Sequence, residues 1–297
     1  MKQNRILLLF LLLWPLSVDA QSSGIYYREP QAWSVGYLPD EVSGTSLLFY
    51  LDGRLWTCND HGALHLYALD TLTAEVDTVV DLGGTVYDLE EVALDRDYLY
   101  FGDFGDNRGV RTDLRILRLS RRDFAEGRFH FDTIRFHYPD RSRTLARNYD
   151  CEAFVVGADS IYLFTKQWVT HNSVCYALPK LPGDYVAERR FTLHTDGLVT
   201  GACYLPERRT LVFVGYSLTI KPFVYVVDGF EGEEFSSGRH RRTALANPFA
   251  TQTEGIASHD GVHFFLTHET LTLRLLTRKA ALLRLDLDDL PEESNIR

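Results

Sequence analysis

The chain has 297 residues, of which 45% are hydrophobic and 13% aromatic, so it can bury the core of one large domain or two ordinary ones. Tyr and Phe make up most of the aromatic residues, which favours strands over helices. The formal net charge of −10 makes nucleic acids and anionic membranes poor partners, whereas it suits the binding of cations.

Residues 1–20 have the pattern of a secretory signal peptide. Lys2 and Arg5 precede the apolar run Ile6–Leu13, and Val18 and Ala20 supply the small residues of a cleavage site. This run is short for a bilayer span, and no other stretch is long and apolar enough for one. We therefore expect an exported protein, in the periplasm, at the cell surface or secreted. Residues 21–297 should form a single domain with no membrane span.

Three kinds of short segment recur five times in the same order. The first opens a strand, and its copies begin at residues 41, 88, 150, 198 and 252. The second is an apolar strand that ends in polar residues, as in LWTCND, LYFGD, IYLFTK, LVFVGYS and HFFLTHE. The third is another apolar strand, as in LYALD, ILRLS, CYALP, VYVVD and LLRLD. Equivalent residues lie 47, 62, 48 and 54 positions apart, which is typical of β-propeller blades.

A fourth strand follows in three copies, at residues 75–82, 131–138 and 188–195. The fifth copy has no chain left for one, but residues 31–38 have the alternation to supply it. We therefore predict an all-β fold, a five-bladed β-propeller closed by an N-terminal strand that leaves no open sheet edge. Six blades are the alternative, if the long second repeat or residues 229–250 contain extra strands. The basic run 238–242 is expected to be a solvated loop.

The start of a blade's first strand and the end of its second lie on the same face of the disc, because these two strands are antiparallel. The starts carry Glu41 and the predicted metal ligands Asp88, Glu90, Asp150, Glu152 and Glu254. Crowded carboxylates repel one another, and hard oxygen ligands favour Ca²⁺ or Mg²⁺. Alternatively, these acids accept hydrogen bonds from neighbouring strand starts and lock blade to blade.

The ends of the second strands and the loops after them are expected to form an outer ring on this face. This predicted ligand-binding face consists of Asn59, Asp60, Asp103, Asp106, Asn107, Lys166, Tyr216 and Glu269. Tyr216, Trp168 and Trp56 could contribute aromatic surface there or belong to the core. Lys166, with Arg108 or Arg111, is expected to neutralise part of the acidic charge. The partner would be a protein or a small molecule at the channel mouth.

Cys58, Cys151, Cys175 and Cys203 include no Cys-x-x-Cys pair, so zinc ribbons and haem attachment are disfavoured. Disulfides and buried free thiols both remain open. The loop GDFGDN at 102–107 has neither dinucleotide-binding nor EF-hand spacing, and the chain lacks His-Glu-x-x-His and Gly-x-Ser-x-Gly.

The motifs NDHG, YDLEEVALD and GDFGDN resemble those of a group of exported bacterial β-propeller proteins, and the similarity covers most of residues 40–270. That group has an Asp-Trp-Glu-Asp strand start and a Gly-Asp-x-Gly-Asp/Asn-Asn loop; His61 here replaces a usual Ser, and Leu89 a usual Trp. The resemblance implies a propeller fold and export. The Glu-Gly strand start at Glu254 more distantly resembles calcium-dependent gluconolactonase and phosphotriesterase propellers. That likeness implies that Glu90, Glu152 and Glu254 hold a metal.

Two functions follow from these observations. The favoured one is a binding or scaffold propeller of the cell envelope, with an acidic channel mouth that Ca²⁺ can occupy. The alternative is a metal-dependent hydrolase of lactones, esters, phosphoesters or glycans, in which Glu152 or Asp103 acts as general base.

Overall fold

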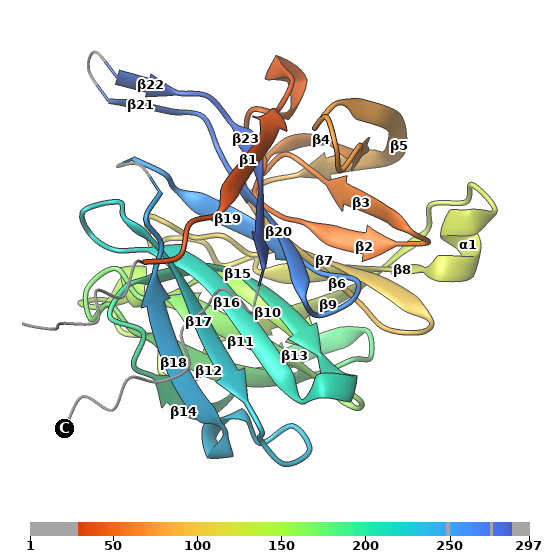
Figure 1. Ribbon diagram of the computed structural model, residues 1–297. Helices are drawn as coiled ribbons and strands as arrows, with labels where there is room; N and C mark the ends of the chain where they lie inside the picture. The colour runs from red at the N-terminus through yellow and green to blue at the C-terminus, as the bar shows by residue number, and fades with distance from the viewer. Residues whose placement is uncertain (1–28, 248–249, 274–275, 287–297) are drawn as a thin grey trace, which may run out of the picture.

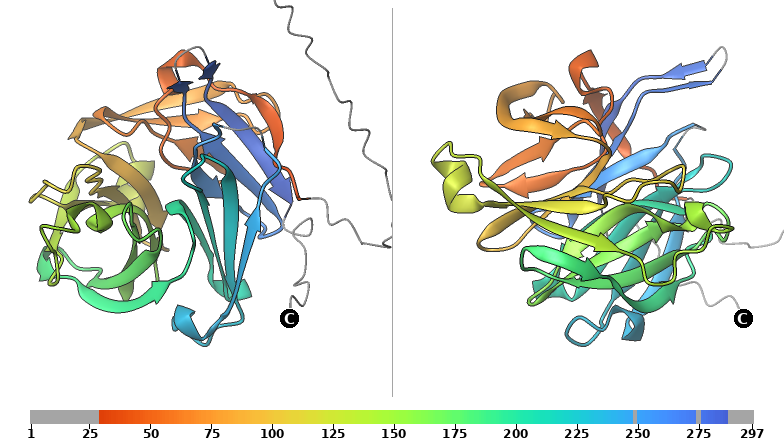
Figure 2. Two further views of the ribbon diagram at one scale, coloured as in Figure 1. Left: turned by 90° about the vertical axis from the view of Figure 1, so that its left-hand side faces the viewer. Right: turned by 180° about the vertical axis from the view of Figure 1, so that it is seen from behind.

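The computed structural model describes residues 29–247, 250–273 and 276–286, so the predicted signal peptide lies outside the described residues. Within this part of the chain, five sheets, antiparallel except for one added parallel strand, are arranged in a ring (Figure 1; Figure 2). The fold is the predicted five-bladed β-propeller, and none of the described strands forms a sixth blade.

Each blade has its first strand in the centre and later strands successively outward. Blade 1 contains β2 (Phe49–Leu51), β3 (Arg54–Thr57), β4 (Gly62–Leu69) and β5 (Val76–Val86). Blade 2 contains β6 (Leu89–Leu94), β7 (Tyr98–Asp103), β8 (Arg115–Ser120) and β9 (Phe131–His137). Blade 3 contains β10 (Asp150–Val156), β11 (Ser160–Lys166), β12 (Ser173–Pro179) and β14 (Glu188–Leu193). Blade 4 contains β15 (Leu198–Leu205), β16 (Thr210–Tyr216), β17 (Pro222–Asp228) and β18 (Arg239–Ala244).

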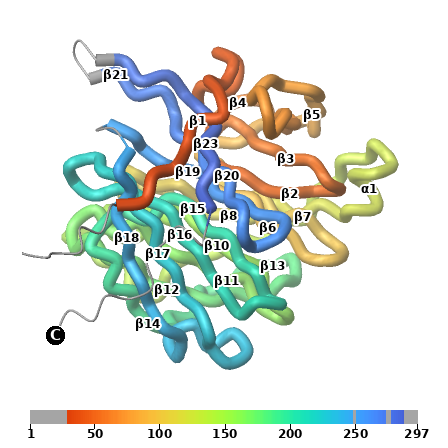
Figure 3. Tube along the Cα trace, viewed as in Figure 1, coloured from red at the N-terminus to blue at the C-terminus, as the bar shows by residue number. Residues whose placement is uncertain are grey.

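Blade 5 closes the ring by joining the two ends of the described chain. It contains β19 (Thr253–Ala257), β20 (His263–His268), β23 (Ala281–Asp286) and, as its outer strand, β1 (Trp33–Tyr37). β1 pairs antiparallel with β23, with Trp33 opposite Arg284 and Tyr37 opposite Ala281. The red and blue ends of the tube lie side by side in Figure 3. The predicted closure by residues 31–38 is confirmed.

Short elements decorate the ring. A hairpin of β21 (Leu271–Leu273) and β22 (Leu276–Arg278) is inserted in blade 5 and extends away from the disc (Figure 1). β13 (Gly183–Val186) follows β12 of blade 3 but pairs in parallel with β9 of blade 2, so it couples two neighbouring blades. One helical turn, α1 (Arg121–Ala125), has Ser120 as its N-cap. The described 3₁₀ turns are η1 (Asp40–Val42), η2 (Ala146–Tyr149), η3 (Pro206–Arg208) and η4 (Phe235–Ser237).

The apolar core lies between adjacent sheets. Strands of a propeller blade are buried on both faces, so each pair of neighbouring blades shares its own cluster of aromatic and aliphatic side chains. Phe104 and Phe154 join blades 2 and 3 at a ring-centroid distance of 5.5 Å. Phe164 and Phe213 join blades 3 and 4 at 4.7 Å. Aromatic edge-to-face contacts of this kind add to the burial of apolar area.

Two sequence predictions at the level of elements are wrong. The first strand of blade 1 does not open at Glu41: residues 40–42 form η1, Glu41 is exposed, and β2 begins at Phe49. The basic run 238–242 is not a loop, because it lies mostly in β18, the outer strand of blade 4. There Arg239 and Arg241 both pair with Asp228 of β17, so the arginines belong to a charged sheet edge.

The four cysteines are free thiols, and Cys58, Cys151 and Cys175 are buried. The sequence left disulfides and free thiols open, and the structure has free thiols. No helix in the described part of the chain is long and apolar enough to cross a membrane.

Candidate functional site: an acidic cavity at the channel mouth

A cavity of about 170 Å³ lies at the face of the disc where the first strands begin. Side chains from all five blades and the segments between them reach it. It is lined by Gly44, Thr45, Ser46, Asp60, Asp88, Glu90, Asn107, Glu152, Lys166, Trp168, Tyr216, Gln252, Glu254 and Glu269. Six of these residues are acids and one is a lysine, so the cavity has a strong excess of potential negative charge.

β-Bulges aim the central acids into this cavity. In β6 the ladder passes from Leu89 to Glu91, which leaves Glu90 as the extra residue. Glu152, Thr200 and Glu254 stand at the same kind of irregularity in β10, β15 and β19. A bulge disturbs the strict alternation of a strand and turns a side chain away from its ordinary side. In blades 2 to 5, the third residue of each repeat copy is therefore the bulged one.

Lys166 supplies the positive charge in the cavity. Its Nζ lies 2.9 Å from Glu152 Oε1, and both side chains are buried. The ammonium also lies over the rings of Trp168 and Tyr216, at 4.9 Å and 5.3 Å from their centroids. Burial disfavours the ammonium, but attraction to Glu152, Glu254 and other anions outweighs burial and raises the pKa of Lys166 well above its ordinary value. Lys166 is thus a built-in cation held against Glu152.

Glu254 has no comparable partner. Its side chain lines the cavity although the residue is only 7% exposed, and no described group donates a hydrogen bond to its carboxyl group. Burial is the main cause that raises the pKa of Glu254 to about 8, and Glu269 adds to it, while Lys166 opposes the shift. A buried carboxyl group without donors is costly when ionised. It is either protonated or matched by a cation from outside the chain.

Asp88 and Glu90 are two further acids of the cavity, and the pKa values of both are raised. Burial, together with the charge of Asp150, raises the pKa of Asp88 to about 6. Burial and the charges of Glu152 and Asp88 hold the pKa of Glu90 well above its ordinary value. The backbone of Gly105 approaches both carboxyl groups so closely that an added Cβ would overlap Glu90 Oε1 and lie 2.6 Å from Asp88 Cγ.

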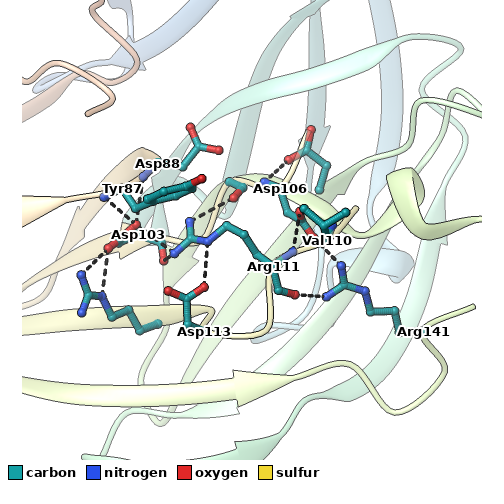
Figure 4. Close-up of polar contacts among 11 residues, drawn as sticks. Tyr87, Asp88, Asp103, Asp106, Val110, Arg111, Asp113 and Arg141 are labelled. Atoms are coloured by element: carbon teal, nitrogen blue, oxygen red, sulfur yellow. Dashed lines mark hydrogen bonds and ion pairs between the residues drawn. The ribbon is translucent and has the colours of Figure 1, made fainter. Parts of the chain in front are cut away.

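The loop after β7 uses its two aspartates to hold itself together (Figure 4). Asp103 is fully buried, accepts hydrogen bonds from the backbone N–H groups of Tyr87 and Asp88 at 3.2 Å and 3.0 Å, and pairs with Arg111 and Arg115. Asp106 likewise accepts from the backbone of Val110 and Arg111 and pairs with Arg141. Neither carboxylate lines the cavity.

Asp150 connects blades rather than facing the cavity. Its carboxylate accepts a hydrogen bond of 2.7 Å from the backbone N–H of Asp106 in the blade 2 loop, and one of 2.8 Å from Trp168 Nε1. The contact with Asp106 joins blades 2 and 3, as the locking alternative expects, although its donor lies in the loop after β7 and not at a strand start; Trp168 belongs to blade 3 itself. Asp103 and Asp150 thus have a structural role, while Asp88, Glu90, Glu152 and Glu254 surround open space.

The glycines of GDFGDN give room to neighbouring groups. A Cβ on Gly102 would overlap the ring of Phe104, and one on Gly105 would overlap the cavity acids. The loop therefore carries two glycines because it packs against an aromatic core residue on one side and against the acidic cavity on the other.

Of the predicted ligand-binding face, the structure brings Asp60, Asn107, Lys166, Tyr216 and Glu269 to the cavity. Asn59 lies outside it and donates through Nδ2 to the carbonyl of Glu41. Trp168 and Tyr216 are at the cavity, whereas Trp56 belongs to the core.

Sequence reasoning did not include Thr45 and Ser46, which line the cavity just before β2. It also missed Glu91, which is fully buried and accepts a hydrogen bond of 3.0 Å from the backbone N–H of Ala202 in blade 4. Burial holds the pKa of Glu91 well above its ordinary value. The repeat of first-strand starts identified Glu90, but nothing in it marked the next residue as a link between non-adjacent blades.

The oxygen donors of the cavity suit Ca²⁺ chemically. Among the described residues, however, no three side chains of His, Cys, Asp or Glu form a group arranged to hold a metal ion.

The sequence matches no family model and no curated protein. Several solved structures are similar in shape. A glucose dehydrogenase has a TM-score of 0.44 and 12% identity, covering 86% of this chain and 83% of that one. The β-propeller domain of Cps50 (Swd1) from Myceliophteria thermophila has a TM-score of 0.41 and 10% identity, with 85% and 98% covered. A protein assigned as a 6-phosphogluconolactonase from Bacteroides uniformis has a TM-score of 0.38 and 12% identity, with 84% and 70% covered. Similarities at this level say nothing about activity.

Proposed function

We propose that this chain is an exported binding protein whose acidic cavity takes a positively charged group of a ligand. The observation that carries the proposal is Glu254, a buried carboxyl group in an open cavity that no described donor satisfies. Five further acids line the same cavity, and Lys166 is ion-paired with Glu152. An incoming cation would offset the cost of ionising these buried acids, so the site selects for positive charge.

The cation is an organic ammonium group or the Ca²⁺ expected from the sequence. Both carry positive charge, which the acidic cavity attracts, but they differ in the number of oxygen ligands that they require. Ca²⁺ needs six to eight oxygen ligands at 2.3–2.6 Å. An ammonium group needs only three acceptors, and among the described residues no three side chains of His, Cys, Asp or Glu form a group arranged to hold a metal ion. The geometry therefore favours ammonium.

Thermal melts test the proposal. The wild-type protein is melted in EDTA, then with CaCl₂, MgCl₂ or methylammonium chloride at matched ionic strength. A ligand that binds the native state raises the melting temperature with concentration. The expected result is a rise with methylammonium or Ca²⁺ that Glu254→Gln abolishes, because the amide keeps the shape of the side chain and removes its charge.

The matched control is Glu207→Gln, which makes the same chemical change on an exposed residue of η3, in the loop between β15 and β16. This variant should respond to the cations as the wild type does. If no cation raises the wild-type melting temperature, or if both variants respond equally, the cavity is not a cation site.

Hydrolysis is the second candidate, and one observation favours it. The pKa values of Asp88 and Glu254, about 6 and about 8, lie on either side of neutral pH. Such a pair can supply a general base and a general acid. The two general bases expected from the sequence are already engaged in ion pairs: Glu152 with Lys166, and Asp103 with two arginines. Turnover of a lactone or phosphoester that Asp88→Asn abolishes without lowering stability would support this function over simple binding.

A further inference from the structure

A groove of about 510 Å³ continues from the acidic cavity outward between blades 1 and 2. Asp60, Asp88 and Asn107 line both the cavity and the groove, so the two form one continuous depression. The remaining walls include Tyr87, Arg108 and Val110. A ligand with its cationic group in the cavity therefore has a path along which the rest of the molecule can lie.

The apolar part of the groove is exposed and partly pre-organised. Tyr87 is 68% exposed and Val110 is 70% exposed, and both line the same groove. The guanidinium of Arg111 lies 4.9 Å from the ring centroid of Tyr87. Arg111 itself is held by Asp103 and Asp113 (Figure 4). The Tyr87 ring is thus supported on one face and open to a ligand.

Two polar side chains along the groove lack partners among the described residues. The side-chain amide of Asn107, at the junction of cavity and groove, makes no described hydrogen bond; only its backbone carbonyl accepts one, from Arg147. An amide of this kind can donate to and accept from one peptide group. Arg108 is exposed and has no described ion pair or hydrogen bond, so it can receive a carboxylate.

We propose that the groove and cavity together bind a short peptide with a free amino terminus. Its ammonium group enters the cavity beside Glu254, its first peptide group meets Asn107, an apolar side chain lies against Tyr87 and Val110, and its carboxylate reaches Arg108. This inference rests on the proposed cation site and extends it. A bare metal ion would use the cavity alone, whereas the negative cavity and the unpaired Arg108 complement a molecule with charges of both signs.

Isothermal titration calorimetry with three probes tests the inference. These are tri-alanine, N-acetyl-tri-alanine and tri-alanine amide. The acetylated peptide should bind at least about tenfold more weakly, since it loses a charge-assisted interaction with the cavity. The amide should bind several-fold more weakly than the free acid. In Arg108→Gln the acid and the amide should bind equally, because the partner of the carboxylate is gone.

Variants of the apolar wall of the groove provide an independent test. Replacing the central alanine by leucine should tighten binding to the wild type, and Val110→Ser should remove that gain. Val79→Ser changes an exposed valine of β5 outside the lining of the cavity and groove and should leave the gain intact.

The outcomes separate this inference from the proposed function. If methylammonium or Ca²⁺ binds through Glu254 while tri-alanine and its acetylated form bind equally weakly, the peptide is wrong and the cation site stands. Tight binding of tri-glucosamine in place of the peptides would also overturn the peptide, in favour of an amino-sugar chain. If none of the cations, peptides or sugars binds, both proposals fail.

Discussion

At the scale of single residues, acids of similar sequence context have opposite roles. Asp103 and Asp150 are satisfied by backbone donors, arginines or Trp168, whereas Glu254 faces a cavity with no described donor. The sequence predicted where these acids would gather, because strand starts and ends repeat along the chain. It did not predict their division into two kinds, because that depends on donors from other blades, such as the Asp106 backbone for Asp150.

The raised pKa of Glu254 predicts a pH dependence of stability. Its folded-state pKa of about 8 exceeds the ordinary value of 4.5, so the native state binds the proton more tightly than the unfolded chain. The stabilisation is complete below the unfolded pKa and is lost as the pH rises through about 8. The raised pKa of Asp88 also stabilises the native state at low pH, and this contribution is lost as the pH rises through about 6.

Urea unfolding across this pH range, without added cations, should therefore show stability falling toward alkaline pH. In Glu254→Gln the fall between about pH 5 and 8 should be shallower, by about 1 kcal/mol per pH unit, because one titrating group is removed. An unchanged slope in that variant would mean that Glu254 is ionised in the native state with a partner of its own.

At the scale of elements, alternation and repeat spacing predicted most strands, including the outer strands at 131–138 and 188–195. The bulges at Glu90, Glu152, Thr200 and Glu254 could not be predicted, since a bulge leaves no signature in the apolar pattern. The strand at 239–244 was missed because its arginines suggest a loop, yet they pair with Asp228 and stack on Phe223. β13 was missed because its partner β9 belongs to another blade.

The loop after β7 makes a test at this scale. Gly105→Ala should displace Asp88 and Glu90, because the new Cβ would overlap the carboxyl group of Glu90. We expect a loss of about 1–3 kcal/mol in the free energy of unfolding, as for other overpacked sites, together with weaker binding of the cation. Calorimetric titration with methylammonium and urea unfolding measure the two effects.

Gly102→Ala is the matched control, since its Cβ would overlap the Phe104 ring in the core and not the cavity acids. It should lower stability to a similar extent while the folded protein keeps the wild-type affinity. Equal loss of affinity in both variants would show that the loop acts only through general stability.

At the scale of the whole molecule, the ring depends on one strand from the far end of the chain. Three strands of blade 5 come from residues 253–286, and the fourth is β1. Residues flanking β1 are also anchored: Ala32 exchanges backbone hydrogen bonds with the Asn247 side chain, and the backbone N–H of Leu38 donates to Ala280. Ala32 and Leu38 are buried in the clusters on the two sides of blade 5.

Removing residues 1–38 should therefore open the ring at β23. The chain would lose the ladder with β1 and the buried side chains beside it, and β23 would become an unpaired edge that can pair with another molecule. We expect a loss of roughly 3 kcal/mol or more in stability, from the apolar area of Ala32, Val35 and Leu38 alone, and a tendency to dimerise or aggregate. Thermal melts and size-exclusion chromatography measure both effects.

A chain that begins at Glu29 keeps β1 and is the control; it should melt as a monomer at a higher temperature. Equal melting temperatures for the two truncations would mean that β1 does not hold the ring closed, and the cavity acids of blades 1 and 5 would then owe their arrangement to the first strands alone.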